Sequence, residues 1–500
     1  MKMRPGSPPL RRSGARANLP FITPRRALVD AGLSPPTESE AHERTRKANS
    51  SQPAGSFSPW RCGVNLSWDR LLCNQRPHRA GNGPKEASKS QTLVRSAFER
   101  DYGRIVFSTP FRRLSKKTQV HPFASIDFIH NRLTHSLEVA SLGQTFGLSL
   151  YELLKKKNVS ISKVSEIEFS SIIEAACLAH DIGNPPFGHA GEDAIKAWAE
   201  RTDWSKLGSV NPADWLHYDG NAQTFRMVSN PEPRDSAYFR LTYATCGSIV
   251  KYPWAVGTYP EKDKGGCFTY DLDRFDEIMS ELGLRRPDES TPQYVRHPFS
   301  FLMEAADDIC YQVMDIEDAV TLHILSEDRM KRLLATVAEE EDRCADCSIQ
   351  HLRGNAIHKL CNSAFAAFEK NYDAILSGEF KGALTESEDF SKKAAFRELK
   401  EEYKGIFSER SKVITEVGCY GVMDRLLTRY SNLAVNLSSA KDFKSLRSGD
   451  SKLVEMTWGR NYTEDAILKH RGDVMWWLHA ATDHIVGMTD DYAQKTASLF

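Results

Sequence analysis

The spacing of apolar residues limits the fold of this chain more than any other feature. Over most of its length they recur at steps of three and four, as in HSLEVASLGQTFGLSLYELLKKK, EFSSIIEAACLAHD and HPFSFLMEAADDICYQVMDIEDAV. This period is typical of helices that bury one face. Alternating patterns are scarce, and only VITEVGCYGVMDRLL, residues 413–427, leaves room for a short strand ahead of a helix. With neither internal repeats nor a βαβ rhythm, we expect a mostly helical, all-α protein.

The N-terminal residues follow no such period. Residues 1–64 are rich in Pro, Arg, Ser and Ala, and a segment of this composition cannot bury enough apolar surface to fold alone. We interpret it as an extension: a disordered arm, a targeting peptide or sequence upstream of the true start. The folded domain is predicted to span residues 65–500.

Charge and cysteine content narrow the class of protein. Lysine plus arginine equals aspartate plus glutamate, at 66 each, so nothing favours a dedicated nucleic-acid or membrane-surface protein. The sequence has no apolar leader and no apolar run long enough to span a membrane, and its ten cysteines are scattered. These features predict reduced thiols in a cytoplasmic protein.

One cysteine pair has metal-type spacing. Cys344 and Cys347 form a CxxC in RCADCS, but the nearby partners for a zinc knuckle are His351 and His358, at an unusual spacing. We interpret the pair as two thiols in a polar helical segment.

The polar residues of AHDIGNPPFGHAGE stand out against the helical pattern. His180 and Asp181 end an apolar helix, where a carboxylate opposes the helix macrodipole and needs a compensating cation. After a rigid Gly-Pro-Pro turn, His189 and Glu192 are three apart and share a face of the next helix. The segment is interpreted either as part of a metal-centred active site or as a polar helix corner.

Two further places hold polar residues beside predicted helices. Arg132 and His135 share a face near the start of one helix, where the alternative is an exposed basic turn. His217 stands ahead of Asp219 in HYDGNAQTFR, where the alternative is an ordinary helix cap.

A fourth place is EAADDICYQVMDIEDAV. Asp307, Tyr311 and Asp315 are spaced i, i+4 and i+8, along one helix face. The apolar residues between them indicate a buried helix, and buried carboxylates need a metal or a hydrogen-bonded ligand. The alternative is a solvated acidic face.

Together these places supply two histidines and two aspartates from three helices, His135, His180, Asp181 and Asp307. Mixed imidazole and carboxylate ligation suits Mn, Fe, Co, Ni, Zn or Mg. Four protein ligands leave positions on an octahedral metal for water and for a phosphate oxygen. The set therefore favours metal-assisted hydrolysis of a phosphate ester or anhydride.

The order of these residues resembles a known signature. His135, then His180-Asp181, then Asp307 follow the H…HD…D pattern of HD-domain phosphohydrolases. Longer sequence motifs, from about residue 65 to the C-terminus, are similar to those of the dGTP triphosphohydrolase (dGTPase) family: SWDRLL, RSAFERDYGRIVFSTPFRRLSKKTQV, NRLTHSLEVA, AHDIGNPPFGHAGE, DGNAQTFR, KYPW, EAADDICY and DHIVGMTDDYA. The resemblance implies an HD core at about residues 130–320 and a helical C-terminal region at about 321–500.

The resemblance also implies an activity and its residues. The family hydrolyses a deoxynucleoside triphosphate to deoxynucleoside and inorganic triphosphate, by attack of water at the α-phosphorus, and so controls dNTP pools. A divalent ion, Mn, Mg or another first-row transition metal, would be held by His135, His180, Asp181 and Asp307. His189 would act as general acid on the leaving nucleoside oxygen, or assist the attacking water, with Glu192 orienting it. The substrate would contact Gln119, Arg132, His217, Lys251, Tyr311 and Asp315.

Base choice and partners are less marked in the sequence. No motif identifies base-recognition residues, so dNTPs other than dGTP stay open as substrates. The resemblance implies a homo-oligomer with an effector dNTP or single-stranded DNA, and no membrane contact. Two alternatives of other classes are an HD-domain hydrolase of different specificity (a nucleoside monophosphatase or phosphodiesterase) and a nucleotide- or single-strand-binding protein.

Overall fold

The computed structural model describes residues 65–77, 95–120, 129–161, 164–208, 210–230, 239–259, 262–287, 292–343, 346–407 and 410–500. The predicted extension over residues 1–64 and Cys344 of the CxxC pair lie outside these ranges. None of the helices within them combines the length and the apolarity that a membrane crossing requires.

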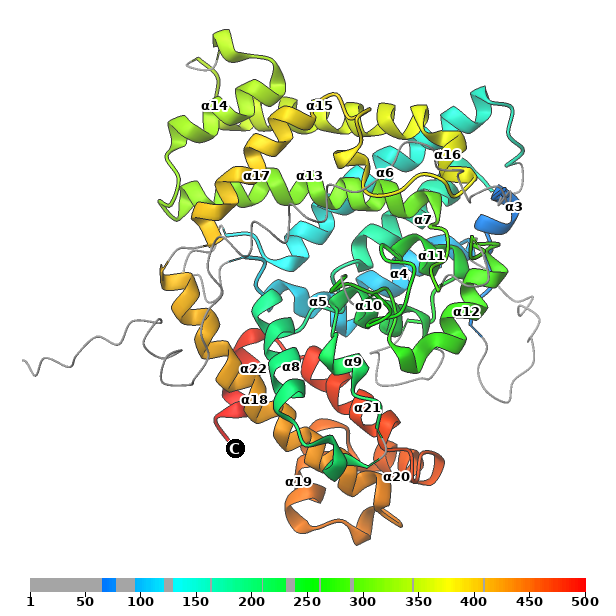
Figure 1. Ribbon diagram of the computed structural model, residues 1–500, viewed down its shortest axis with the longest axis vertical. Helices are drawn as coiled ribbons and strands as arrows, with labels where there is room; N and C mark the ends of the chain where they lie inside the picture. Colours follow the sequence, from blue (N-terminus) through cyan, green and yellow to red (C-terminus); the bar gives the residue numbers. More distant parts are fainter. Residues whose placement is uncertain are drawn as a thin grey trace, which may run out of the picture. The chain divides into compact units, whose positions relative to one another are not determined.

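The prediction of a mostly helical, all-α fold is confirmed. Within the described ranges the chain forms no named strand, and β pairing is limited to two isolated bridges, Thr118 with Asn131 and Ala255 with Cys267. The α-helices, which Figure 1 shows, are α3 (Trp68–Leu71), α4 (Ala97–Val106), α5 (Thr109–Arg113), α6 (Arg132–Lys156), α7 (Glu166–Ala179), α8 (His189–Arg201), α9 (Ala213–Leu216), α10 (Gly220–Ser229), α11 (Tyr243–Ile249), α12 (Leu272–Glu281), α13 (Pro298–Thr321), α14 (Glu327–Ala338), α15 (Ile349–Lys370), α16 (Tyr372–Leu376), α17 (Lys393–Phe407), α18 (Arg410–Ser439), α19 (Ser448–Thr457), α20 (Arg460–Lys469), α21 (Val474–Val486) and α22 (Asp490–Ala497).

The short strand considered within residues 413–427 is wrong, because these residues belong to the continuous helix α18. Buried side chains recur at helical steps along one face of this helix, which is formed by Cys419, Met423, Leu426, Leu427 and Tyr430. The helix packs on α8 and α21. These tertiary contacts outweigh the local β preference of its Val and Ile residues.

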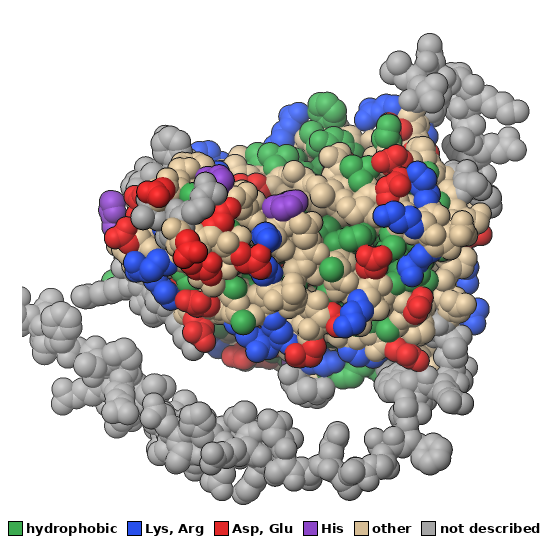
Figure 2. All heavy atoms as spheres, turned by 90° about the horizontal axis from the view of Figure 1, so that it is seen from above, with side chains coloured by type: hydrophobic (Ala, Val, Ile, Leu, Met, Phe, Trp, Pro, Cys, Tyr) green, Lys and Arg blue, Asp and Glu red, His purple; other side chains and the backbone are tan. Residues whose placement is uncertain are grey.

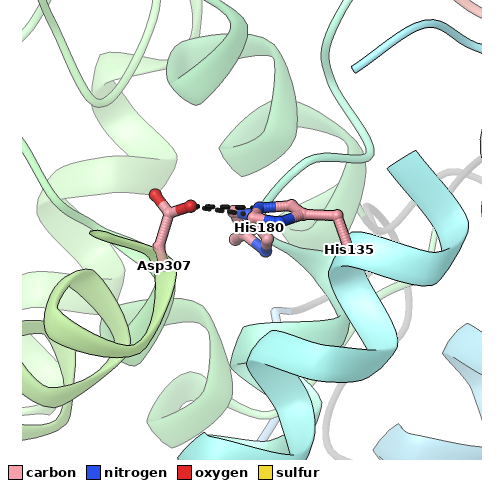
Figure 3. Close-up of side chains that lie close together, drawn as sticks. All are labelled: His135, His180 and Asp307. Carbon is pink, nitrogen blue, oxygen red and sulfur yellow. Dashed lines mark hydrogen bonds and ion pairs between the residues drawn. The ribbon is translucent and has the colours of Figure 1, made fainter. Parts of the chain in front are cut away.

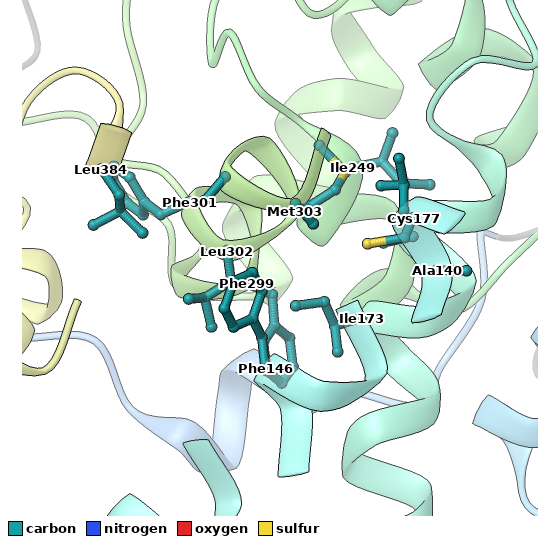
Figure 4. Packing of buried hydrophobic residues seen from close by; sticks show 14 of the residues in the cluster. Ala140, Phe146, Ile173, Cys177, Ile249, Phe299, Phe301, Leu302, Met303 and Leu384 are labelled. Carbon is teal, nitrogen blue, oxygen red and sulfur yellow. The ribbon is translucent and has the colours of Figure 1, made fainter. Parts of the chain in front are cut away.

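The larger hydrophobic core is built around α6, α7 and α13. A Cβ atom on Gly143 of α6 would lie only 2.4 Å from the Sγ atom of Cys177 on α7, so glycine permits the close approach of the two helices. α13 packs against both of them and against α15. Figure 4 shows side chains of these helices meeting in the core, among them Phe146, Ile173 and Leu302. The buried faces therefore fix the three helices relative to one another.

A second hydrophobic core joins α8 and α9 to the C-terminal helices. α18 packs along α8, α21 and α22, and Figure 1 shows these four helices together although they come from distant parts of the chain. Trp215 on α9 and Trp477 on α21 are fully buried in this core. Helix α8 is thus held by residues near the C-terminus.

A buried arginine on α10 fastens the C-terminal helices to the rest of the domain. The Nη1 atom of Arg226 donates to Asp271 at 3.0 Å, and its Nε atom donates to Asp483 on α21 at 3.0 Å. All three side chains are almost inaccessible to solvent. Because each charge is paired and hydrogen-bonded, its burial is compensated.

Candidate active site

His135, His180 and Asp307 come together from three helices of the larger core (Figure 3). α6 begins where the side chain of Asn131 caps its first turn, which sets His135 one turn into the helix. His180 is the C-cap of α7, and Asp307 lies within α13. The Nε2 atoms of His135 and His180 lie 3.1 and 3.5 Å from the Oδ1 atom of Asp307.

The His180 side chain is oriented as a metal ligand requires. Its Nδ1 atom donates to the carbonyl of Cys177 at 2.6 Å, which turns the Nε2 lone pair toward the site. This Nε2 atom is buried and has no hydrogen-bond partner among the described residues. The donor atoms of His135, His180 and Asp307 all lie within 4.8 Å of one another. A buried lone pair beside a second imidazole and a carboxylate fits a divalent metal ion.

The charges of these groups suit a bound cation. Burial raises the pKa of Asp307, but His180, His135 and Lys251 outweigh it and hold that pKa well below its usual range. Burial lowers the pKa of His180, but Asp181 and Asp307 outweigh it and raise that pKa to about 9. A metal ion would therefore take the place of the proton that His180 otherwise holds.

Asp181 reaches the same cavity but has other partners. Its Oδ2 atom accepts from the Nη1 atom of Arg132 at 2.6 Å, and its Oδ1 atom accepts from the Nδ2 atom of Asn184 at 2.6 Å. The Oδ1 atom also lies 3.6 Å from the Nε2 atom of His180. Burial raises the pKa of Asp181, but Arg132 and the histidines lower it to about 2. Asp181 is therefore an anion whose Oδ1 atom lies beside the three-donor group.

The turn between α7 and α8 has an unusual backbone that the C-terminal helices hold in place. Phe187 and Gly188 have φ angles of +67° and +60°, a region that costs a residue with a side chain about 1 kcal/mol or more. The backbone N–H of Phe187 donates to the Oδ1 atom of Asp490 at 2.9 Å, and that of Thr118 donates to the Oδ2 atom at 3.0 Å. The carboxylate of Asp490 thus joins two segments that face the cavity.

A buried lysine holds the other side of this turn. The Nζ atom of Lys117 donates to the carbonyls of Asn184 at 2.7 Å and Val486 at 2.6 Å. Burial lowers its pKa to about 7, and neighbouring Arg132 acts in the same direction. The end of α21 therefore contributes to the position of the turn.

α8 begins at His189 and sets it beside Glu192. The Nδ1 atom of His189 lies 3.1 Å from the Oε2 atom of Glu192, while its imidazole is 64% exposed. The Oε1 atom of Glu192 accepts from the backbone N–H of Gly220 at 2.8 Å, and a Cβ atom there would lie 2.7 Å from that oxygen. Burial raises the pKa of Glu192, but His189 and Lys264 lower it to about 2. Glu192 is thus an anion that orients the imidazole.

Two lysines add positive charge. The Nζ atom of Lys251 lies 3.6 Å from the Oδ2 atom of Asp307 and 3.7 Å from the Oε1 atom of Glu304. The Nζ atom of Lys264 lies 3.8 Å from the Oε2 atom of Glu192. Burial lowers the pKa of both lysines, but the surrounding carboxylates outweigh it and raise both above the ordinary value. Both side chains are therefore cations.

These side chains surround a cavity of about 280 Å³. The residues predicted from the sequence that line it are Gln119, Arg132, His135, His180, Asp181, His189, Glu192, Lys251, Asp307 and Tyr311. His217 and Asp315 are not among its lining residues. His217 instead lies close to Gly257, and Asp315 is buried one helical turn beyond Tyr311.

The cavity has further lining residues that the sequence did not single out, namely Asn184, Gly220, Asn221, Tyr252, Lys264 and Asp308. Tyr252 and Asp308 directly follow predicted residues, so attention to flanking polar positions would find them. Lys264 stands in a stretch without motif or helical period. Only the fold brings it to Glu192.

Known proteins similar to this chain share most of its length. Residues 132–210 match the family model described as HD domain. A deoxyguanosinetriphosphate triphosphohydrolase-like protein of Pseudomonas aeruginosa is 36% identical over 460 residues, which cover 86% of this chain and 98% of the relative. A protein of the same description from Listeria monocytogenes is 29% identical, with coverages of 86% and 98%. A deoxyguanosinetriphosphate triphosphohydrolase of an Enterobacter species is 30% identical, with coverages of 83% and 95%.

Proposed function

This chain belongs to the dGTP triphosphohydrolase family of HD-domain hydrolases, and on that premise we propose that it hydrolyses dGTP, and other dNTPs beside it, to deoxynucleoside and inorganic triphosphate. One observation supports the proposal above all. A single cavity unites a group of metal-type donors, cationic side chains and an acid–base pair. These are the parts that hydrolysis of a polyphosphate ester needs.

We propose that His135, His180, Asp181 and Asp307 hold one divalent ion, with Mn²⁺ and Mg²⁺ as the first candidates. Such an ion lowers the pKa of a bound water and neutralises charge on the phosphate. The buried Nε2 lone pair of His180 and the low pKa of Asp307 favour this ligand set. The remaining steps fall to side chains of the chain itself.

The triphosphate would be bound by Arg132, Lys251 and Lys264. All three are cations. Lys251 lies near Asp307 of the metal-type donors, and Lys264 lies near Glu192. Donors arranged in advance around a cavity stabilise phosphate charge without reorganising during the reaction. Gln119, Tyr311 and Asp315 are proposed to contact the sugar, with Tyr311 packed where a 2′-OH would stand and so excluding ribonucleotides. His217 is proposed to line the phosphate site once substrate is bound.

The proposed reaction joins a water oxygen to the α-phosphorus and breaks the bond from that phosphorus to the nucleoside 5′ oxygen. The water loses a proton to solvent, and the departing oxygen gains one from His189. Glu192 keeps the imidazole in position through the 3.1 Å contact. The products are then an uncharged deoxynucleoside and triphosphate.

Product analysis tests this proposal. Full-length protein is incubated with dGTP and Mn²⁺ or Mg²⁺, and free deoxyguanosine with intact triphosphate is expected. Release of dGMP with pyrophosphate, or of phosphate in steps, would refute it. A panel of four dNTPs and GTP then tests the sugar contact. We expect turnover of GTP to be at least about tenfold lower than that of dGTP, and equal turnover would contradict the role given to Tyr311.

Family membership also supports proposals about partners. We propose that the chain acts as a homo-oligomer in the cytoplasm and responds to an effector dNTP or single-stranded DNA. Activity with and without a second nucleotide or a DNA oligomer tests the effector, and the molar mass in solution tests the oligomer.

A further inference from the structure

The connection between α14 and α15 holds a second group of metal-type donors, far from the sequence motifs of the active site. Glu340 follows the left-handed residue that ends α14, and His351 lies in the first turn of α15. Cys347 stands just before Ser348, whose side chain caps α15 by accepting from the N–H of His351 at 3.2 Å. The end of one helix and the start of the next thus bring a carboxylate, a thiol and an imidazole together.

The three donors converge on a small volume. The Oε2 atom of Glu340 lies 3.0 Å from the Nε2 atom of His351 and 3.8 Å from the Sγ atom of Cys347, and all three atoms are within 4.8 Å of one another. Tetrahedral zinc, with bonds of about 2.0 Å to N or O and 2.3 Å to S, needs donors roughly 3.3–3.6 Å apart. Small rotations of these side chains therefore give a zinc-sized site.

A neighbouring amide orients the carboxylate. The Nδ2 atom of Asn355 donates to the Oε1 atom of Glu340 at 2.7 Å and lies 3.0 Å from the Nε2 atom of His351, so one amide positions both side chains beside the thiol. Cys347 is 8% exposed, whereas His351 is exposed, so the group opens to solvent on one side. Figure 2 looks onto the face that carries α14 and α15, where histidine side chains stand beside acidic ones. The group therefore has an entry path for an ion.

We propose that Glu340, Cys347 and His351 form a metal site that binds zinc and fastens the start of α15 to the end of α14. The thiolate separates this site from the catalytic one. Thiolate ligands select zinc over Mg²⁺ or Mn²⁺, whereas the donors of the active site are imidazole and carboxylate alone. The site concerns the stability of this connection and takes no part in hydrolysis. The proposal makes Cys347 a metal ligand, whereas the sequence indicated only a thiol in a polar helical segment.

Cobalt substitution tests the site with a signal specific to sulfur. Reduced, full-length protein is freed of metal by a chelator and titrated with Co²⁺, which occupies zinc sites and shows a near-ultraviolet charge-transfer band when a thiolate binds it. The residues that line the active-site cavity include no cysteine, so Co²⁺ bound there gives no such band. We expect the band in the wild-type protein and its loss in Cys347→Ser. His351→Ala should weaken Co²⁺ binding about tenfold or more, and Asn355→Ala about tenfold.

Matched controls lie on the same helix. Cys361→Ser changes a nearly buried thiol within α15, and His358→Ala changes a histidine of α15 that pairs with Asn362. Both should keep the band, and Cys347→Ser should keep dNTP hydrolysis and the helical circular dichroism spectrum. Absence of the band in the wild-type protein, or its survival in Cys347→Ser, would overturn the proposal. If Cys347→Ser fails to fold, the ratio of Co²⁺ affinities between His351→Ala and His358→Ala decides, and equal affinities would count against the site.

Discussion

The metal-type donors and the His189–Glu192 pair face one cavity, but two different hydrophobic cores support them. His135, His180 and Asp307 belong to α6, α7 and α13 of the larger core. His189 and Glu192 belong to α8, which packs on α18 in the second core. The C-terminal helices therefore shape half of the cavity, although the HD-domain match ends at residue 210. We call His135, His180 and Asp307 the metal half of the cavity, and His189 and Glu192 the acid half, after the roles proposed for them. A substitution in one core can therefore disturb one half and leave the other intact.

The two halves also differ in how their side chains are fixed. The side chains of His135 and His180 are largely buried and that of Asp307 is partly exposed, and their geometry follows from helix packing and from the hydrogen bond of His180 to the backbone. His189 is largely exposed, and its position depends on Glu192 and on backbone contacts of the turn before α8. The positions of His135, His180 and Asp307 should therefore tolerate substitutions in the C-terminal helices, whereas the position of His189 should not.

Replacing a metal donor should cause the largest loss. His180→Ala removes the oriented lone pair, so divalent metal should no longer bind at the active site and kcat should fall by about a thousandfold or more. Equilibrium metal binding and steady-state kinetics measure the two effects, with His358→Ala on α15 as the surface control. Full activity in His180→Ala would show that the metal group is misassigned.

Replacing His189, the proposed general acid, should lower kcat without weakening metal binding. His189→Ala leaves the buried donors untouched, so metal affinity should stay within about twofold while kcat falls by about 10²–10⁴. The same two measurements apply, and Glu192→Gln should give a smaller loss because the imidazole is retained but less well oriented. Parallel loss of metal in His189→Ala would contradict the independence of the two halves.

Local sequence patterns singled out the residues on both sides of the cavity, but not the distant residues that hold the turn before α8. The carboxylate at the end of an apolar helix, the pair Arg132 and His135 on one face, and Asp307 within a buried helix all carry local signals of period and charge. Such signals survive folding because each depends on one helix. Local signals of this kind also predicted the helical fold. The exception is residues 413–427, where Val and Ile favoured a short strand, but packing of α18 on α8 and α21 stabilises a helix.

Other residues gain their places through long-range contacts that no local pattern encodes. Lys264 meets Glu192, and Asp490 meets Phe187, only because distant segments fold together. The group formed by Glu340, Cys347 and His351 likewise depends on folding. The sequence showed Cys347 and His351 at an unusual spacing, but no local pattern indicated that Glu340 lies beside them. Asp315 is predicted from its helical spacing to contact the substrate, and its side chain is buried one helical turn beyond Tyr311, so this contact stays a prediction.

The carboxylate of Asp490 offers a test of the acid half from a distance. Asp490→Ala removes the acceptor for two backbone N–H groups, those of Phe187 and Thr118, and each unsatisfied group costs about 1–3 kcal/mol. We expect the free energy of unfolding to fall by about 2–4 kcal/mol and kcat to fall more than metal affinity. Urea unfolding and kinetics measure these changes. Asp491→Ala, at an exposed neighbour, should change the free energy of unfolding by less than about 0.5 kcal/mol. Equal losses of stability in the two variants would contradict the role of Asp490 in joining the two segments.

The smallest expected effect is a pH dependence confined to the metal half. The Nδ1 atom of His130 lies 2.7 Å from the Oδ1 atom of Asp318 on α13, and its Nε2 atom lies 3.4 Å from the Oε1 atom of Glu138 on α6. Burial lowers the pKa of His130, but the two carboxylates outweigh it and raise that pKa from 6.5 to about 10. Between these values the folded chain binds a proton that the unfolded chain has lost, so this contribution is complete below pH 6.5 and disappears as the pH rises through 10.

Because the imidazole is partly exposed, solvent screening should limit this decline to about 1 kcal/mol. Urea unfolding of the wild-type protein at pH 6.5 and at pH 10, compared with His130→Gln, isolates it, since the variant lacks the titrating group but retains a hydrogen-bond donor. Between these two pH values the unfolding free energy of the variant should fall by less than that of the wild-type protein, whereas Asp491→Ala, at an exposed position, should keep the wild-type dependence. Equal slopes in wild-type and His130→Gln would mean that the link between α6 and α13 is a neutral hydrogen bond, and that the metal half is held by packing alone.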